Sequence, residues 1–243
     1  KYFDELLERI KTIRVSERMA YQKITDLFIA TAADYNPKAE EAYTFFKIVQ
    51  NKLHFAISGH TAAELIYSRA NSDKEHMGLT NWKNSPDGLI YKYDVIIAKN
   101  YLNEEEMNNL KDLTNLFLVF AEDEAKQRHV MTMKDWIDAT DDLLKFRRKE
   151  ILNNSGSISH KEAVEKAIIN QIKNEEHSSR LYLSMASWCQ VNGYPGAAAF
   201  LYKQTDEERM HMLKFVHFLN DRNGYSKLLA LDNPTQEYKS LLD

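Results

Sequence analysis

Glycine and proline are scarce in this chain, and their scarcity limits the folds that it can adopt. The 243 residues contain seven Gly and four Pro, whereas a β-sandwich or β-barrel needs turn residues about every eight to twelve positions. The sequence therefore argues strongly against an all-β fold. With 44% hydrophobic and 28% charged residues, it has the balance of a folded chain and not of a disordered one.

Apolar residues recur at spacings of three, four and seven along most of the sequence, which is the period of an amphipathic helix. Over 2–33 this pattern predicts one helix. Further helices are expected over 39–57, 60–70, 107–126, 133–152, 159–191 and 195–222. The stretch 71–94 lacks the period and is expected to be a loop or a small hairpin. Beyond Gly224 we expect a loop, with the start of another helix at Gln236.

The strongest linker signal is Asn-Asn-Ser-Gly-Ser at 153–157. Small polar residues and Gly favour irregular backbone, and Ser159 shortly after them has the character of a helix N-cap. We therefore expect an all-α protein with two domains, 1–156 and 157–243. The two long helices of the second domain are separated only by 191–196, so they are expected to form an antiparallel αα-hairpin.

The second helix of this hairpin contains Glu-Arg-Met-His, an E-x-x-H pattern that puts Glu208 and His211 on one face about one turn apart. At about 1.5 Å of rise per residue, Glu175 and Glu208 lie at similar heights of roughly 27 and 22 Å above the turn. They can therefore face each other. One Glu and one E-x-x-H are half of the ligand set of a di-iron carboxylate bundle. Carboxylate and imidazole ligands suit Fe(II), Mn(II) or Zn(II), and the lack of thiolates argues against a structural zinc site.

The same region resembles helices A and B of bacterial non-haem ferritin. The segments that carry the resemblance are NEEHSSRLYLSMASWC at 174–189, GAAAFL at 196–201 and DEERMHM at 206–212. They follow the family's order, and the resemblance covers about 161–243. It implies that Glu175 is the iron ligand of helix A, Glu208 the bridging carboxylate and His211 the imidazole ligand. By the same resemblance Tyr182 is the tyrosine near the ferroxidase centre, a catalytic position.

A ferritin subunit has four long helices, and the third supplies another glutamate, so the resemblance covers half of a four-helix bundle. Two explanations stay open. Either the natural chain continues into the missing helices, or two hairpins from separate copies pair and give a site with two Glu and two E-x-x-H. Each implies a di-iron centre that is completed by residues outside this hairpin.

Apolar residues on the two hairpin helices exceed what two helices can hide from water. They are Leu181, Met185, Trp188, Phe200, Leu201, Met212, Phe215 and Phe218. We therefore expect a homo-oligomer, and the resemblance to ferritin implies a closed cage.

Residues 1 to about 165 resemble the C-terminal portion of the RhuM virulence-associated family. The resemblance is carried, in order along the chain, by Tyr2–Ile10, Gln50–His54, Gly59–Glu64, Met77–Trp82, Ala98–Leu102 and Met131–Trp136. The family is associated with pathogenicity and mobile elements, without a settled activity. Its members have an additional N-terminal region suspected of binding DNA, and the resemblance implies that nucleic acid would be bound through that missing region.

A group of ionisable residues around the irregular stretch has two interpretations. As an enzyme site, it would use His60 as general base and Lys74 or Arg69 as an anion clamp for a nucleotide or phosphodiester. As a structural feature, which we favour, Thr61 and Glu64 would form a capping box with the S/T-x-x-E spacing. His54 and His60 would then make buried hydrogen bonds, and the cations would lie in solvent.

Net charge, cysteine content and the length of the apolar runs argue against several classes of protein. With 32 Lys and Arg against 36 Asp and Glu, the net charge is −4, so no global basic field attracts nucleic acid. The basic run 145–149 closes a predicted helix, where cations are favoured by the helix dipole, although a phosphate contact is the alternative. A single cysteine, no apolar run near the roughly 20 residues of a membrane span and no apolar leader indicate a soluble, cytoplasmic protein.

The interpretation that joins these observations is an iron-binding ferritin-like protein fused to a RhuM-like domain, with Fe(II) oxidation and storage at a di-iron carboxylate site. On this interpretation the hairpin is a ferroxidase. The alternative is a virulence or phage-defence factor that acts on nucleic acid, in which the ferritin-like part serves only for oligomerisation.

Overall fold

The computed structural model describes residues 1–16 and 20–240, and over these ranges its regular structure is helical. Nine α-helices and two 3₁₀ helices lie in the described part of the chain, where the extended pairing is an isolated bridge between Ala32 and Met131. The predicted all-α fold is confirmed. No helix within these ranges is both long and apolar enough to cross a membrane.

The chain divides into two compact units. One combines Lys1–Leu65 with Leu102–Ser157, and the other combines Ile66–Tyr101 with Ile158–Asp243. The two domains expected from the sequence stay a prediction, because a compact unit of packing need not fold as a separate domain.

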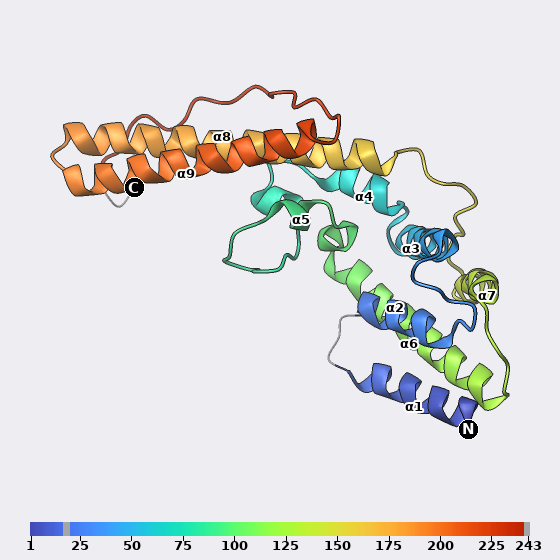
Figure 1. Cartoon of the computed structure of the whole chain (residues 1–243). Coiled ribbons are helices and arrows are strands. Elements are labelled where there is room, and N and C mark those ends of the chain that lie inside the picture. The colour runs from blue at the N-terminus through green and yellow to red at the C-terminus, as the bar shows by residue number, and fades with distance from the viewer. Residues whose placement is uncertain (17–19, 241–243) are drawn as a thin grey trace. The chain divides into compact units, whose positions relative to one another are not determined.

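The first unit consists of helices whose apolar faces meet in one core (Figure 1). They are α1 (Tyr2–Val15), α2 (Ala20–Thr31), α3 (Glu40–Ser58), α6 (Glu104–Lys126), α7 (Met133–Phe146) and the start of α4 (Ala62–Arg69). The single helix expected over 2–33 is therefore two helices. The first ends where Ser16 takes up extended backbone angles and its hydroxyl donates to the carbonyl of Ile13 at 2.7 Å. Residues 17–19 lie outside the described part.

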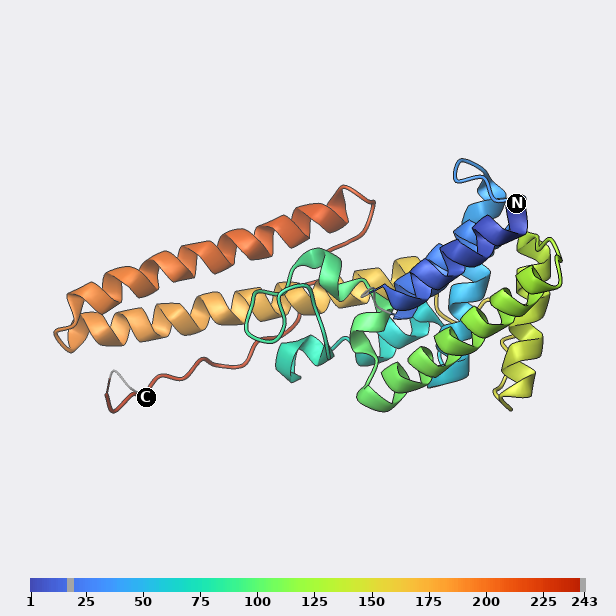
Figure 2. The ribbon, with the colours of Figure 1, turned by 90° about the horizontal axis from the view of Figure 1, so that it is seen from below.

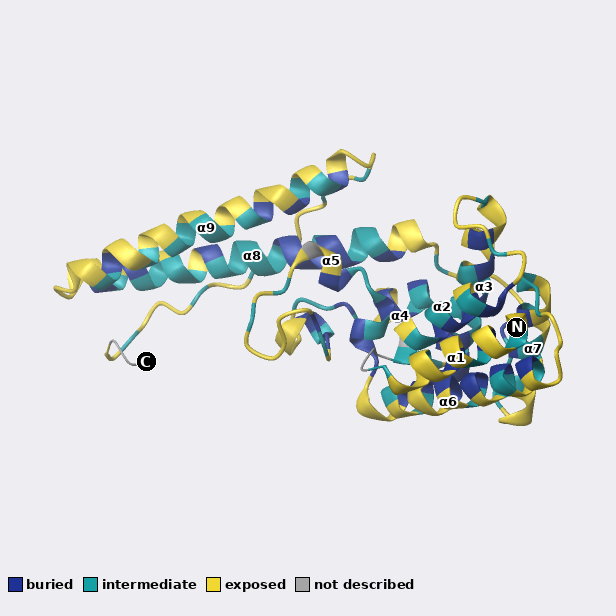
Figure 3. Cartoon of the chain, turned by 60° about the horizontal axis from the view of Figure 1, so that its bottom comes forward, coloured by how far each residue is buried: buried dark blue, intermediate teal, exposed yellow. Residues whose placement is uncertain are grey.

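Aromatic side chains from four of these helices form the centre of the first unit. The ring of Phe28 lies 4.9 Å from that of Trp136, 5.3 Å from that of Phe45 and 5.8 Å from that of Phe117. All four side chains are buried, and Figure 3 shows the buried residues of the helices in dark blue. The indole N–H of Trp136 donates to Thr31 Oγ1 at 2.9 Å, so the polar atom of this ring is satisfied inside the core.

The helix ends follow from local sequence. Helices α6, α7 and α8 each begin with a complete capping box, formed by the pairs Asn103 and Glu106, Thr132 and Asp135, and Ser159 and Glu162. Gly59 ends α3 with a φ of 72°, a conformation that costs glycine little. The helix expected over 133–152 is shorter, because α7 ends at Phe146 and Arg148 has a φ of 54°.

The second unit contains the two longest helices that the structure describes and a loop-rich segment that packs with them. Its elements are the end of α4, the 3₁₀ helices η1 (Glu75–Gly78) and η2 (Ala98–Tyr101), and the helices α5 (Lys92–Val95), α8 (His160–Val191) and α9 (Pro195–Asn220). In the stretch expected to be a loop or small hairpin, the structure has loop, η1 and the start of α5, so the loop prediction holds.

The predicted αα-hairpin is present. Helices α8 and α9 lie side by side and antiparallel in both Figure 1 and Figure 2. Gly193 in the connecting turn has a φ of 85°, which allows the chain to reverse at little cost. Between the helices, the hydroxyl of Ser179 donates to the carbonyl of Thr205 at 2.9 Å. The hairpin is thus joined by a polar contact as well as by apolar packing.

Residues of the 66–101 segment are tied to the first half of α8. The backbone N–H and hydroxyl of Ser72 donate to Asn170 Oδ1, each at 3.2 Å, and Lys173 forms an ion pair with Asp73 at 2.7 Å. These bonds explain why the segment belongs to the same compact unit as the hairpin.

Beyond α9 the described residues 221–240 form a tail without a helix, so the helix expected to start at Gln236 is absent over this range. The tail runs back along the hairpin (Figures 1 and 2). It is held where the hydroxyl of Ser184 donates to the carbonyl of Thr235 at 2.6 Å and where the ring of Tyr238 meets that of Trp188 at 5.9 Å.

Candidate metal centre

Three potential metal ligands meet between the two hairpin helices. Glu175 lies on α8, and Glu208 and His211 lie one turn apart on α9. One ligand atom from each of the three residues falls within 4.8 Å of the others. The Nδ1 atom of His211 is 3.2 Å from Glu208 Oε2 and 3.7 Å from Glu175 Oε2. The structure therefore brings together the three residues that the sequence identified as ligands.

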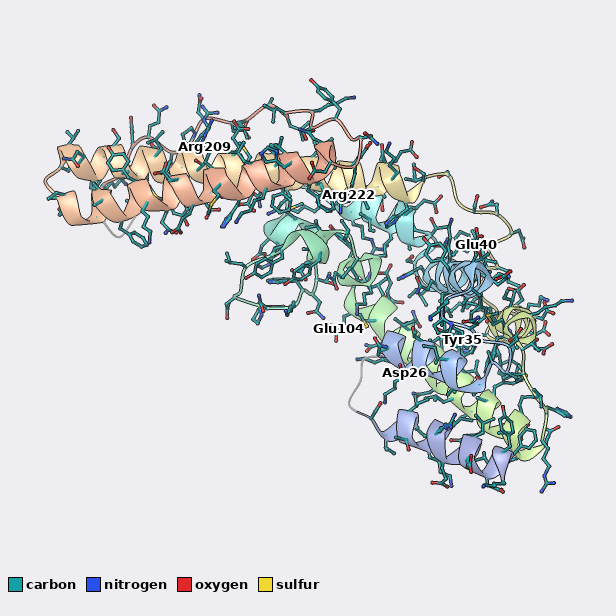
Figure 4. All side chains as sticks on the ribbon, viewed as in Figure 1. Asp26, Tyr35, Glu40, Glu104, Arg209 and Arg222 are labelled. Carbon is teal, nitrogen blue, oxygen red and sulfur yellow. The ribbon has the colours of Figure 1, made fainter. Side chains whose placement is uncertain are left out.

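The trio lies among buried residues of both helices. They are Ile172 and Ser179 on α8, and Met212 and Phe215 on α9. The carboxylate side chains are consequently only 12% exposed for Glu175 and 18% exposed for Glu208, whereas the imidazole of His211 is 35% exposed. Figure 4 marks this part of α9 by Arg209, the exposed neighbour of Glu208. The site is closed on the carboxylate side and more open at the histidine.

Burial changes the acid–base behaviour of Glu175. The pKa of Glu175 rises from its ordinary value of 4.5 to about 8, chiefly because burial disfavours its charged form. A hydrogen bond with the Glu208 carboxyl and the negative charge of that residue raise the pKa further, and a hydrogen bond from Gln171 acts in the opposite direction. The Glu175 carboxyl therefore keeps a proton near neutral pH, which a bound cation would replace.

The donor set fits a transition metal that prefers oxygen and nitrogen. Two carboxylates and one imidazole suit Fe(II), Mn(II) or Zn(II), and the three residues include no thiolate. A di-iron carboxylate bundle takes a Glu from each of two helices and a Glu-x-x-His from each of the other two. The hairpin supplies one of each, which is half of such a set.

Tyr182 lies on the same face of α8 as Glu175, closer to the hairpin turn. The two residues are seven positions apart on one helix, which corresponds to two turns and about 10 Å along the axis. The tyrosine is half-buried. Its expected role at the ferroxidase centre stays a prediction.

Gln171 is a polar neighbour of the site that the sequence reasoning missed. Its Nε2 atom donates to Glu175 Oε1 at 2.6 Å, and the residue is 4% exposed. A signal was present in the sequence, because Gln171 and Glu175 are four positions apart and so lie on one helix face. Glutamine at this spacing is common on helix surfaces, and only the structure shows that this one is buried.

The ionisable residues singled out around the irregular stretch make local contacts in the structure. The capping box of Thr61 and Glu64 is confirmed: the Thr61 N–H donates to Glu64 Oε2 at 2.9 Å, and the Glu64 N–H donates to Thr61 Oγ1 at 3.3 Å. The Nδ1 atom of His60 lies 2.8 Å from the Ser58 carbonyl. His60 and Glu64 belong to the first compact unit, whereas Lys74 belongs to the second.

Arg69 and the basic run at the end of α7 also have structural partners. In the second unit, Arg69 donates to the carbonyl of Tyr101 at 2.6 Å. In the first, Lys145 pairs with Asp142 at 3.1 Å and Arg147 with Asp112 at 3.8 Å. Lys145 and Arg147 are therefore partly neutralised by acids of their own unit.

Family models match both the N-terminal and the C-terminal parts of the chain. The model of the virulence protein RhuM family matches residues 1–180, and the model of the ferritin-like domain matches residues 165–243. No solved structure matches the chain.

The similar curated proteins match the C-terminal region. The bacterial non-heme ferritin of Campylobacter jejuni subsp. jejuni is 42% identical over 80 residues, which are 33% of this chain and 48% of the ferritin. A probable bacterial non-heme ferritin-like protein of Haemophilus influenzae is 40% identical over 80 residues, with the same coverage. The bacterial non-heme ferritin of Staphylococcus saprophyticus is 34% identical over 77 residues, 32% of this chain and 46% of that protein.

The chain thus spans about half the length of the ferritins that it matches, and the hairpin of α8 and α9 falls almost entirely in the matched region. The RhuM model, in contrast, covers most of the chain. The protein therefore belongs to the virulence protein RhuM family and carries a ferritin-like region at residues 165–243.

Proposed function

We propose that the ferritin-like hairpin binds Fe(II) through Glu175, Glu208 and His211 and supports its oxidation. The observation that carries the proposal is the convergence of these side chains, whose ligand atoms lie within 4.8 Å of one another. The similarity of this region to non-heme ferritins supports iron as the metal, and the oxygen and nitrogen donors agree with that choice.

The hairpin residues would act by exchanging the proton of Glu175 for a cation. Glu175 would release this proton on binding, and Glu175 and Glu208 would then hold two negative charges against the metal, which favours the more highly charged ferric product. His211 presents Nδ1 to both carboxylates, so its neutral form would coordinate through Nδ1 and keep its proton on Nε2. Iron would supply the one-electron step from Fe(II) to Fe(III), with dioxygen or peroxide as the electron acceptor.

The complete site would draw its second half from residues outside this hairpin. We propose a homo-oligomer, because exposed apolar side chains on the hairpin need cover. Phe200 is 61% exposed on α9, and Leu183, Met210 and Leu213 are also exposed. The mass of the oligomer measured together with the iron per chain distinguishes a second copy that supplies iron ligands from one that only covers this surface.

The test is oxidation of Fe(II) by the purified protein. Protein loaded anaerobically with Fe(II) is mixed with oxygenated buffer, and ferric absorbance in the near ultraviolet is followed for wild type, E208A and the neighbouring control E176Q. Wild type and E176Q should oxidise iron faster than buffer alone, and E208A should not. Equal rates with and without wild-type protein would contradict the proposal. If an intact oligomer accompanied that result, the alternative of a hairpin that serves only for assembly would be favoured.

Tyr182 enters the proposal as a residue that affects oxidation without binding the metal. Its place about two turns from Glu175 leaves the ligand set unchanged when the hydroxyl is removed. Y182F should therefore bind the same amount of Fe(II) as wild type and oxidise it at an altered rate. An unaltered rate would remove Tyr182 from the proposed machinery.

A further inference from the structure

Glu175 has two carboxylate oxygens in different environments. Oε1 accepts the hydrogen bond from Gln171 Nε2 at 2.6 Å. Oε2 is the oxygen that faces Nδ1 of His211, at 3.7 Å. One oxygen is therefore engaged by α8 itself, and the other is directed toward α9, where the remaining candidate ligands lie.

Gln171 is well suited to hold this arrangement. It lies one turn before Glu175 on the same face of α8, and side chains four positions apart on a helix are close enough to form a hydrogen bond. The residue is 4% exposed and therefore surrounded by protein. An amide N–H can donate to a carboxylate whether or not the second oxygen binds a cation, so the contact can persist in the loaded site.

The side-chain amide of Gln171 also lowers the stability of the folded protein. The Oε1 atom of Gln171 is buried and has no hydrogen-bond partner among the described residues. A buried polar atom without a partner destabilises a protein, and an apolar side chain of similar size would avoid that penalty. Packing alone therefore does not account for glutamine at this position, whereas the bond to Glu175 does.

We infer that Gln171 is a positioning residue that fixes Glu175 as a ligand through a single oxygen, Oε2. This inference rests on the proposed function, because it assumes that Glu175 binds the metal. Without the amide, Glu175 could rotate and offer both oxygens to one cation, or turn away from His211. Hydrogen-bond partners of metal ligands typically affect metal affinity about 10–100-fold when they are removed.

The test uses Co(II) as a spectroscopic probe in the full chain. Q171M keeps the length of the side chain and removes its hydrogen bond, and Q190M is the matched control at an exposed position of the same helix. Under anaerobic conditions, Q171M should bind Co(II) about 10–100-fold more weakly than wild type. Its visible absorption at saturation should also be less intense, because a carboxylate that binds through two oxygens raises the coordination number. Q190M should match wild type in both measurements.

The spectrum at saturation separates positioning from a merely structural role. A residue that only supports the hairpin would lower affinity and leave the spectrum of the filled site unchanged, and that result would overturn the inference. Equal affinity and equal spectra of Q171M and wild type would overturn it as well. If wild type itself binds no Co(II), the proposed function fails first. Circular dichroism confirms that each variant is folded, and Q171L provides a second apolar replacement if Q171M is not.

Discussion

Glu175 Oε2 on α8 and His211 Nδ1 on α9 lie 3.7 Å apart across the hairpin. Neither helix could form this site alone, because each contributes only part of the donor set. The relationship depends on the register of the two helices, and the bond from Ser179 to the Thr205 carbonyl helps to hold that register. The predictions below test the site, the first unit and the assembly separately.

The metal-free protein should become less stable as pH rises through the range in which Glu175 keeps its proton. In the unfolded chain this group ionises near 4.5, whereas in the folded protein its pKa is about 8. Between these values the folded state binds more protons than the unfolded state, so the free energy of unfolding falls with pH, by at most about 1.4 kcal/mol per pH unit for one proton. Below 4.5 the group has no effect.

The E175Q variant isolates this contribution. Gln cannot ionise, so E175Q should be more stable than wild type at pH 8 by a margin that shrinks toward pH 5, and it should lose metal binding. Urea unfolding of the metal-free proteins at several pH values measures the difference, with E176Q as the neighbouring control. A constant difference between E175Q and wild type across this range would contradict the raised pKa.

The pKa of Glu64 is shifted in the opposite direction to that of Glu175, so its effect on stability should have the opposite dependence on pH. Burial tends to raise its pKa, but hydrogen bonds from the backbone N–H and hydroxyl groups of Ser157 and Thr61 outweigh it and lower the pKa from 4.5 to about 2. The stabilisation by the carboxylate is therefore fully present above about 4.5 and is lost as pH falls through about 2. The E64Q variant should be less stable than wild type at pH 7, and the gap should narrow in acid.

The expected size of the E64Q effect at pH 7 is about 1–3 kcal/mol, because an amide NH₂ cannot accept the bonds that one of the carboxylate oxygens receives. A capping box alone would predict less than about 1 kcal/mol, and the bonds to Ser157 account for the increase. Chemical denaturation at pH 7 and pH 3 measures both values. An effect that does not depend on pH would contradict the lowered pKa.

A single hydrogen bond in the core of the first unit should contribute measurably to stability. T31V preserves shape but leaves the buried indole N–H of Trp136 without the acceptor that it has at 2.9 Å. We expect a loss of about 1–3 kcal/mol in the free energy of unfolding. T12V is the matched control, since the Thr12 hydroxyl is bonded to a backbone carbonyl at an exposed position, and its effect should stay within about 0.5 kcal/mol. If T31V and T12V lowered the free energy of unfolding equally, the buried hydrogen bond would contribute no more to stability than the exposed one.

Assembly should depend on the exposed apolar side chains of the hairpin. Wild type is expected to form an oligomer at micromolar concentration, and F200E should shift the population toward the monomer because it puts a charge on the apolar surface. Light scattering after size-exclusion chromatography measures the mass of each. A wild-type monomer at every concentration would rule out assembly through this surface.

Most helices could be predicted from the sequence because their ends carry local signals. The capping boxes that begin at Asn103, Thr132 and Ser159, together with Gly59, are read from residue type and spacing. The segment between α1 and α2 contains neither Gly nor Pro. Because the apolar spacing continues through it, the sequence predicts one helix where the structure has two. Similarly, apolar residues continue beyond Phe146, and nothing in their pattern marks the end of α7.

The candidate ligands could also be predicted, because height above the turn and the i, i+3 spacing bring Glu175, Glu208 and His211 together once an αα-hairpin is assumed. Gln171 could not be identified in this way. Its importance depends on burial and on which oxygen of Glu175 it contacts, and both follow from the packing of α8 against α9. The assignment of 66–101 to the hairpin's unit depends on contacts between distant parts of the chain, such as Ser72 with Asn170, which have no local signature.

The central claim is that the hairpin binds a metal ion through Glu175, Glu208 and His211, and anaerobic titration with Fe(II) followed by metal analysis tests it most directly. The comparison is wild type with H211A and H217A, since His217 is an exposed histidine on the same helix. Wild type and H217A should retain the same iron per chain, and H211A should retain less because a carboxylate-only site binds Fe(II) more weakly. Equal iron in all three proteins would contradict the claim.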